Sequence, residues 1–339
     1  MMKIAVLNSG SSSLKIKIFD FPSRDVVYER EFEGNAEDIL ESLDIDFASI
    51  DIIGHRVVHG GEELHESIII DEKVICSIDE LSILAPLHNP ANLKGIKIAI
   101  QKAPDALQVA VFDTAFHTTM PKEAYLYALP YEMYEKYNIR RYGFHGTSHS
   151  YLLKEAAKEL KKETMELNII TLHLGNGASA CAIKDGKSID TSMGFTPLEG
   201  LVMGSRSGDI DADIPLFMQR ELNLTFKEVE NILNSESGLR GICGENDMRL
   251  IEKSRNERSQ LAFNMMVRRI QKYIGAYMVL LEHVDAIVFS GGIGANSKRV
   301  RDAVMSNEIL KNIKTLVIKT DEELEIANEC YRIVKKEGI

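Results

Sequence analysis

The sequence predicts an α/β protein built from two similar halves, and three observations favour this fold class. Residues 169–183 read as an apolar strand, a Gly-Asn-Gly turn and a returning apolar strand, which is the pattern of a β-hairpin. Residues 4–18 repeat this pattern without a gap, so that Ile18 falls on Ile183. The chain has 339 residues, enough for two domains with a core each. We therefore expect an internal duplication.

The composition limits the classes of function. A net charge of -11 argues against a general nucleic-acid or membrane-surface binder, since such proteins use a positive field. No apolar run approaches membrane-spanning length, and the first residues lack the core of a signal peptide. The four cysteines are scattered and form no CxxC pair, which favours a reducing cytoplasm; they are Cys76, Cys181, Cys243 and Cys330.

The two glycine turns are candidate phosphate sites, because glycine lets backbone N–H groups approach an anion closely. Most such turns are only turns, but the repeat favours the phosphate interpretation, with the two turns facing one cleft. The first copy adds Asn8, three serines and Lys15. Lys15 and Lys17 alternate with apolar residues and so share one face, either towards the cleft or towards solvent.

In the first half, two polar residues at the ends of apolar strands are candidate site residues. Arg56 lies at the end of one strand beside a Gly-Gly turn, where a buried cation needs an anionic ligand or a carboxylate partner. Asp113 follows another strand, where open α/β sheets place functional groups. His55 and His59 lack the carboxylate of a typical zinc site. The strands are expected at 26–32, 51–58 and 107–112, and the helices at 36–43, 78–84 and 93–101.

In the second half, His145 is expected in a turn before a helix at 151–162, which Thr147 or Ser148 could cap. A turn histidine is more often structural than catalytic. The segment 190–213 is a long glycine-rich loop, and such loops are usually functional. It carries Arg206 between small neighbours that leave room for a ligand.

Towards the C-terminus, 286–296 reads as a strand and a glycine-rich turn that only loosely resembles a dinucleotide fingerprint. Glu322 lies in a helix-capping sequence, where it either complements the helix dipole or coordinates a metal through water. Helices are expected at 214–233 and 257–283, with others beginning near 247 and 298, and a strand at 316–318.

Seven motifs together resemble the acetokinase family, within the sugar kinase, Hsp70 and actin superfamily. They are NSGSSSLK (8–15), GHRVVHGGE (54–62), APLHNP (85–90), FDTAFH (112–117), YGFHGTSH (142–149), HLGNG (173–177) and MGFTPLEGL (193–201). The resemblance implies a duplicated ribonuclease H-like fold with an inter-domain cleft. It implies an N-terminal domain of residues 1–117 plus 325–339, and a C-terminal nucleotide-binding domain of residues 118–324.

The resemblance also implies residue roles. Metal-binding residues would be Asn8 and Glu322, and Lys15 would approach the nucleotide phosphates. Catalytic residues would be Arg56, Asp113, His145 and Arg206. Arg56 would also bind substrate, with an apolar pocket of Val58, Leu87, Phe144 and Pro197 around the methyl end of acetate. The nucleotide would lie along His173, Leu174, Gly175, Asn176 and Gly177, with its adenosine near Asp247, Met248, Arg249, Gly292, Ile293, Gly294, Ala295 and Asn296.

The implied reaction is reversible, Mg²⁺-dependent transfer of a phosphoryl group from ATP to acetate, giving acetyl phosphate and ADP by direct in-line transfer. Mn²⁺ is an alternative metal. Acetate is ionised at neutral pH, so Asp113 is expected to orient groups rather than to act as a base. A propionate kinase and a non-catalytic nucleotide-binding module are the alternatives. The family also implies a homodimer, for which the helix at 260–283 could serve as interface or as core.

The chain departs from the family pattern in four places. Ala295 stands where the family usually has Glu, and Ala212 where it often has Pro. The segments 21–54 and 296–316 are shorter than usual. The second shortening lies next to the expected adenosine site. It leaves nucleotide affinity and base preference open, but not the phosphoryl site.

Overall fold

The computed structural model describes residues 2–9, 13–34, 39–40, 43, 45–86 and 88–338. The chain divides into two compact units. Unit 1 comprises Met1–Thr118, His145–Tyr151 and Asp321–Ile339, and unit 2 comprises Thr119–Phe144 and Leu152–Thr320. These units group residues by contact, so the expected domain limits at 117 and 325 stay a prediction.

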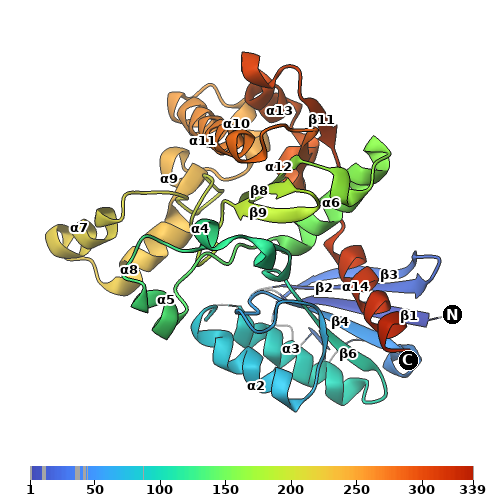
Figure 1. Ribbon diagram of the computed structural model, residues 1–339. Coiled ribbons are helices and arrows are strands. Elements are labelled where there is room, and N and C mark those ends of the chain that lie inside the picture. Colours follow the sequence, from blue (N-terminus) through green and yellow to red (C-terminus); the bar gives the residue numbers. More distant parts are fainter. Residues whose placement is uncertain are drawn as a thin grey trace. The chain divides into compact units, whose positions relative to one another are not determined.

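Unit 1 contains a six-stranded sheet in the order β3-β2-β1-β4-β6-β5 (Figure 1). The first three strands are antiparallel, β1, β4 and β6 are parallel, and β5 is antiparallel to β6. The polar ends of β1, β4 and β6 therefore lie at one edge of the sheet. The strands are β1 Met2–Ser9, β2 Ser13–Phe21, β3 Asp25–Glu33, β4 Ile52–Val57, β5 Ile68–Ile69 and β6 Leu107–Phe112.

Helices cover both faces of this sheet. On one face, α14 (Glu322–Glu337) packs Ile326 and Ile333 against the strands. On the other lie α2 (Glu72–Glu80) and α3 (Asn89–Lys102) (Figure 1).

Three helix predictions in unit 1 need comment. The expected helix 78–84 is wrong in its limits, because α2 begins after Asp71, whose side chain accepts from the Val74 N–H at 2.9 Å. The helix expected at 93–101 begins earlier, at Asn89, with a proline at its start. Most of the helix expected at 36–43 lies outside the described residues.

Unit 2 contains a five-stranded sheet in the order β9-β8-β7-β10-β11. Strands β7, β8 and β9 are antiparallel, and β7, β10 and β11 are parallel, as in unit 1. The fold class is confirmed: it is α/β, with the ribonuclease H-like strand order present twice. The strands are β7 Ile169–Leu174, β8 Ala178–Lys184, β9 Lys187–Thr191, β10 Ala286–Ser290 and β11 Lys314–Val317.

The gapless alignment of the two hairpins is correct for the first strands and wrong by one residue for the return strands. Ser9 pairs with Leu14, which leaves four residues between them, whereas Leu174 pairs with Ala178 across three. Lys15 therefore corresponds to Ser179, since they oppose the equivalent residues Asn8 and His173. A slip of one residue moves a side chain to the other face, so this offset decides which side chains correspond.

The longest helix of unit 2, α11 (Glu257–Leu281), contacts β7 and β8 (Figure 1). The single helix expected at 214–233 is wrong: Asn223 takes a left-handed conformation, and Thr225 begins a second helix with a capping box. The glycine-rich turn expected before 298 is a short helix, α12. The other helices are α4 Lys122–Tyr125, α5 Glu132–Tyr137, α7 Asp213–Leu222, α8 Phe226–Asn231, α9 Gly238–Cys243, α10 Met248–Lys253, α12 Gly291–Asn296 and α13 Lys298–Met305.

Helix α6 (Gly146–Leu160) belongs to both units, since its first residues are in unit 1 and the rest in unit 2. Within the described part of the chain, none of the helices has the length and apolar content needed to cross a membrane.

Candidate active site

An ion pair joins the ends of two neighbouring strands in unit 1. Arg56 on β4 donates from Nη2 to Oδ2 of Asp113, the residue that follows β6. The Asp113 side chain is 1% exposed and the Arg56 side chain 20%. Burial opposes the charge of Arg56, but the Asp113 and Glu322 carboxylates outweigh burial and raise its pKa. Arg56 therefore has the structural partner that the sequence left open, and it remains accessible at one side.

The first turn of α6 fixes Asp113. Thr147 donates its hydroxyl to Oδ1 of Asp113 at 3.1 Å, and Gly146 N–H donates to the Asp113 carbonyl at 2.9 Å. A Cβ on Gly146 would lie 2.2 Å from that carbonyl oxygen, so only glycine fits. The prediction of a helix starting at 151 and capped by Thr147 or Ser148 is therefore wrong, because both residues lie inside α6. His145, the predicted turn histidine, precedes the helix with a left-handed φ of 57°.

Asn8 and Lys15 meet the start of α14. The Asn8 amide donates to Oε1 of Glu323 at 3.1 Å, and Lys15 Nζ donates to Oε2 of the same carboxylate at 2.9 Å. Asn8 Oδ1 accepts from Arg56 at 3.3 Å. Lys17 shares the face of Lys15, as predicted, because both lie within 4 Å of Glu29. Glu323 thus connects two predicted site residues, although no sequence motif singled it out.

Glu322, beside Glu323, is a carboxylate with a raised pKa. Burial raises the pKa of Glu322 to about 7, and the nearby Asp113 and Glu323 charges act in the same direction. Arg56 Nε lies 4.0 Å from its Oε2 and opposes that shift. Three carboxylates here face two cations, Arg56 and Lys15, so an added positive charge would stabilise the group.

The donor set of this cluster fits a magnesium ion. Asn8 Oδ1 and the Glu322 carboxylate are hard oxygen donors. Among the described residues, no group of three His, Cys, Asp or Glu side chains could hold a metal by itself. Mg²⁺ usually takes only one or two protein carboxylates and completes its shell with water and phosphate oxygens. Asn8 and Glu322 therefore stay predicted ligands, in a site where water and substrate oxygens would supply the remaining ligands of the ion.

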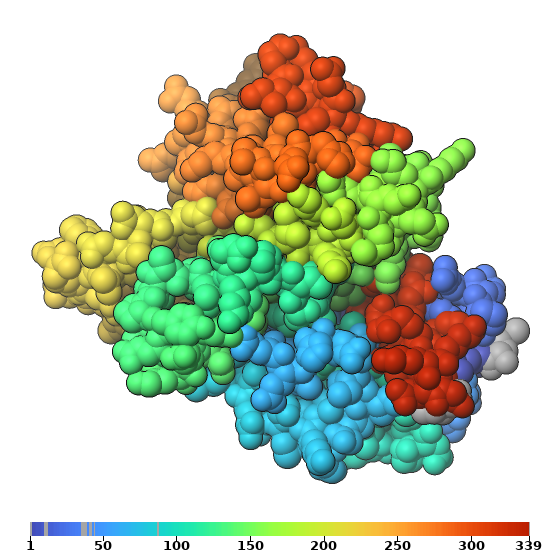
Figure 2. Space-filling view, in the orientation of Figure 1, coloured from blue at the N-terminus to red at the C-terminus, as the bar shows by residue number. Residues whose placement is uncertain are grey.

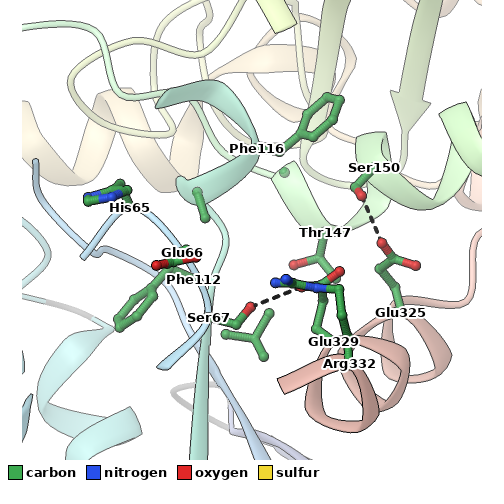
Figure 3. A pocket seen from close by; sticks show the side chains of 13 residues that line it. His65, Glu66, Ser67, Phe112, Phe116, Thr147, Ser150, Glu325, Glu329 and Arg332 are labelled. Carbon is green, nitrogen blue, oxygen red and sulfur yellow. Dashed lines mark hydrogen bonds and ion pairs between the residues drawn. The ribbon is translucent and has the colours of Figure 1, made fainter. Parts of the chain in front are cut away.

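A cavity of about 190 Å³ is lined by residues of β6, α6 and α14 (Figure 3). Figure 3 shows Thr147, Ser150 and Glu325 in its wall, with Phe112 and Phe116 nearby. Ser150 donates to Glu325 at 2.7 Å, which ties α6 to α14. The bonds from Thr147 to Asp113 and from Ser150 to Glu325 thus connect α6 with the residue after β6 and with α14.

In unit 2, Arg206 is a half-buried guanidinium without a carboxylate partner among the described residues. Its one hydrogen bond, from Nη1 to the Pro197 carbonyl, is long at 3.5 Å. Burial lowers the pKa of Arg206. A cation that has lost much of its hydration and lacks a counter-ion is stabilised by a bound anion.

The loop that carries Arg206 is tied to the second glycine turn. Gly204 N–H donates to the Asn176 carbonyl at 2.9 Å, and a Cβ on Gly204 would lie 1.9 Å from Asn176 Oδ1. Farther along, Asp209 accepts from Tyr273 at 3.0 Å and pairs with Arg269 at 3.3 Å, both on α11. The backbone around Arg206 is thus held by the turn and by the longest helix.

A second set of contacts holds the segment 191–199. Arg141 donates to the carbonyls of Thr191 and Met193 at 2.9 and 3.1 Å, and to Glu199 at 2.6 Å. Tyr127 donates to the other oxygen of Glu199. Arg141 and Glu199 therefore position the backbone on which Pro197 lies, and the sequence did not single out either one for a role.

A cavity of about 420 Å³ opens beside the second glycine turn, within the size range of small-ligand sites. Eight of the predicted nucleotide residues line it: Gly175, Asn176, Asp247, Met248, Arg249, Gly292, Ile293 and Asn296. Three lining residues were not predicted: Asn246, Glu252 and Ser297. The predicted residues that are not among its lining are Lys15, His173, Leu174, Gly177, Gly294 and Ala295.

The residues predicted for the acetate methyl pocket lie in separate parts of the chain. Val58 is buried in unit 1, with its N–H donating to Asn92 Oδ1 at 3.1 Å. Phe144 is buried in unit 2, which also contains Pro197. Leu87 lies outside the described residues. The pocket itself stays a prediction.

Comparisons with known proteins find relatives that match nearly the whole chain. The model of the acetokinase family matches residues 33–337. The acetate kinase of Sulfurimonas denitrificans is 50% identical over 388 aligned positions, covering 98% of this chain and 100% of that one. The acetate kinase of Helicobacter acinonychis is 47% identical over 399 positions, covering 99% and 100%. Both alignments exceed 339 positions, so these relatives contain segments that this chain lacks.

Two solved structures are similar over nearly the whole chain. The crystal structure of the Porphyromonas gingivalis acetate kinase has a TM-score of 0.91 at 38% identity, covering 98% of this chain and 100% of that one. The crystal structure of a propionate kinase from Francisella tularensis has a TM-score of 0.91 at 40% identity, covering 97% and 99%.

Proposed function

The chain belongs to the acetokinase family, and we propose that it transfers a phosphoryl group from ATP to acetate, reversibly, giving acetyl phosphate and ADP. As a member of this family it is a phosphotransferase whose acceptor is a carboxyl group. Phosphoryl transfer depends on positioning and on charge neutralisation more than on covalent help from the protein.

The observation that carries this proposal is Arg206. It is a half-buried cation with no ion pair among the described residues, on a loop bonded to the second glycine turn. A structural arginine in such surroundings normally has a carboxylate partner. We propose that the partner of Arg206 is the transferring phosphoryl group, whose charge Arg206 stabilises during in-line transfer.

The acceptor end is assigned to unit 1. Arg56 would bind the substrate carboxylate or the phosphoryl group, and His145 would add stabilisation. Acetate is ionised at neutral pH, so transfer needs no general base. Asp113 is bonded to Arg56 and Thr147, which supports an orienting role for it. The methyl group would contact Val58, Leu87, Phe144 and Pro197.

Asn8 and Glu322 would hold Mg²⁺, with Mn²⁺ as an alternative. Bound there, the ion would neutralise charge on the phosphate oxygens of the nucleotide. Lys15 would approach the same phosphates; in the structure its ammonium is bonded to Glu323.

The nucleotide is assigned to unit 2. The phosphates would follow His173, Leu174, Gly175, Asn176 and Gly177, and the adenosine would take the 420 Å³ cavity near Asp247–Arg249 and Gly292–Asn296. The cavity supports this assignment because it lies beside the glycine turn and has a size typical of small-ligand sites.

The test is ATP-dependent formation of acyl phosphate, trapped with hydroxylamine, from acetate, propionate and butyrate in parallel. We expect the highest turnover with acetate and its loss in Arg206→Ala. Arg258→Ala is the matched control, because Arg258 is an exposed arginine in the first turn of α11. Absence of acyl phosphate from all three acids, with ATP still bound, would reject the proposal.

A propionate kinase is the second candidate, because the Francisella tularensis structure of that name is similar over nearly the whole chain. One methylene in an apolar pocket changes the barrier by only about 1–3 kcal/mol, so the acid series decides between them. A non-catalytic nucleotide-binding module would not need all four of the predicted catalytic residues, which are Arg56, Asp113, His145 and Arg206.

We also propose a homodimer. Helix α7 has no buried residue, and six large apolar side chains on and beside it are exposed. They form the α7 apolar surface: Ile210, Ile214, Leu216, Phe217, Leu222 and Phe226. Figure 2 shows this yellow segment at the molecular surface. Helix α11 serves chiefly as core, since Met266 is buried although Met265 is partly exposed.

Two further assignments belong to this proposal. All four cysteines are free thiols, which is their usual state in a reducing compartment, and we assign the protein to the cytoplasm. The duplicated domains are assigned to residues 1–117 plus 325–339 and to residues 118–324.

A further inference from the structure

We propose that Glu252 selects the nucleotide base, by accepting a hydrogen bond from the exocyclic amine of adenine. This inference rests on the proposed nucleotide site and goes beyond it, because it names the group that discriminates between bases. Glu252 lies on α10 and lines the 420 Å³ cavity.

One hydrogen bond holds the Glu252 carboxylate, and a second holds the Glu252 backbone. Ser297 donates its hydroxyl to Oε1 of Glu252 and accepts from Val300 N–H at 3.0 Å, as the cap of α13. Arg299 donates to the Glu252 carbonyl and to Gln260 at 2.8 Å. Because one carboxylate oxygen and the backbone of Glu252 are both held, less conformational entropy is lost when a ligand binds to the other oxygen.

Glu252 also keeps acceptor capacity that the other carboxylate of the cavity lacks. Asp247 accepts from the Arg249 side chain at 3.0, 3.1 and 2.6 Å, and from its N–H at 2.9 Å, so both oxygens are engaged. For Glu252 Oε2, no hydrogen bond exists among the described residues. An ionised carboxylate is an acceptor only. Glu252 therefore favours a base edge that donates.

The remaining walls suit a flat base. Met248 and Ile293 supply apolar surface. The amide nitrogens of Asn246 and Asn296 already donate, to Asn176 Oδ1 at 3.4 Å and to the Gly292 carbonyl at 2.8 Å, so neither is the first choice as a donor to the base. The 6-amino group of adenine donates, whereas the 6-oxo group of hypoxanthine would face the carboxylate with a second acceptor. A site built to bond a donor rejects the analogue without it.

The test measures binding of three diphosphates with Mg²⁺ by calorimetry: ADP, IDP and purine riboside 5′-diphosphate, which has hydrogen in place of the amine. We expect the wild-type protein to bind ADP at least about tenfold more tightly than either analogue, since the bond involves a charged group. In Glu252→Gln, ADP binding should weaken about tenfold. Binding of the purine riboside diphosphate should change less than about twofold.

Glu257→Gln, on the exposed start of α11, is the matched control and should keep the wild-type ratios. Equal binding of ADP and the purine analogue by the wild type would overturn the assignment, and this arm needs no variant. Equal weakening of both ligands in Glu252→Gln would show a structural role only, which also overturns it. If ADP binds with the expected selectivity but no acyl phosphate forms, the proposed function fails while this assignment stands.

Discussion

The central strands of the two sheets have the same order, but equivalent positions at the ends of these strands carry charged side chains in unit 1 and neutral ones in unit 2. His55 pairs with Leu7 on β1, and Phe289 pairs with the equivalent residue of β7. Arg56 follows His55 and Ser290 follows Phe289, so Arg56 and Ser290 are equivalent. By the same pairing, the unit 1 residues Asn8, Lys15 and Asp113 correspond to His173, Ser179 and Thr320 in unit 2. Unit 1 thus concentrates charge where unit 2 has hydroxyls and an imidazole.

This difference in charge suits the two units to different ligands. Unit 1 has the paired charges suited to a carboxylate, a metal and an orienting aspartate. Unit 2 has a neutral strand edge, a cavity of about 420 Å³ and the half-buried Arg206, which is outside any ion pair in the described chain. A duplicated frame can therefore diverge at the ends of its strands while the sheets stay alike, because side chains there contribute little to the core.

The largest effect is expected at Arg56, and it should appear in both activity and stability. Arg56→Ala leaves the buried Asp113 without its cation, and breaking a buried pair costs about 3–5 kcal/mol of unfolding free energy. Chemical denaturation measures that loss, and the trapping assay should show about 10³-fold lower kcat. The double variant Arg56→Ala/Asp113→Ala should regain part of the stability but no activity. Unchanged stability in Arg56→Ala would contradict the paired role.

Arg206→Ala should lower activity while leaving stability nearly unchanged. We expect kcat to fall about 10³-fold, the scale for an arginine that stabilises a transferring phosphoryl group. The unfolding free energy should change by no more than about 0.5 kcal/mol, since among the described residues the side chain forms one long hydrogen bond of 3.5 Å and no ion pair. A stability loss as large as that of Arg56→Ala would abolish the distinction between the two arginines.

His55 should lower the stability of unit 1 at acid pH. Unit 2 has Phe289 at the equivalent position, which cannot take up a proton. Burial lowers the pKa of His55 to about 4 from 6.5, although the hydrogen bond with Gln108 at 2.8 Å opposes this shift. As the pH falls, His55 takes up a proton in the unfolded chain before it does so in the folded protein. This residue therefore does not lower the unfolding free energy above pH 6.5, and it lowers it progressively as the pH falls towards 4. The expected loss is about 3 kcal/mol. Denaturation between pH 7 and 4 should show this component in the wild type and not in His55→Gln.

The smallest effect is expected from Thr147→Val, which removes one hydroxyl from Asp113. The loss of a single hydrogen bond should cost about 1 kcal/mol of unfolding free energy. It should also lower kcat several-fold without raising the KM for ATP, because Asp113 would orient less well. Thr118→Val, which removes an exposed hydroxyl bonded to Ala115, is the control. An equal effect of both substitutions would argue against a specific role for Thr147.

The sequence predicted the central strands β4, β6, β7 and β10, because each is an apolar run followed by glycine or a polar residue, as β6 is by Asp113. It did not predict the short strand β5 or the strand β9, which lack such a run. It failed where tertiary contacts decide a boundary. Residues 146–150 have poor helix formers, yet the Gly146 N–H bond to Asp113 starts the helix there. Contacts between distant segments, such as Ser297 with Glu252, leave no local pattern, so the base-facing carboxylate could not be predicted.

The unequal hairpin turns record something about the history of the gene. Four residues separate the paired strands in one half and three in the other. If both halves descend from one ancestral segment, a single codon was inserted or deleted after the duplication. The turn absorbed that change without disturbing either sheet. Alignments of the two halves should therefore open a one-residue gap at the turn before their return strands are compared.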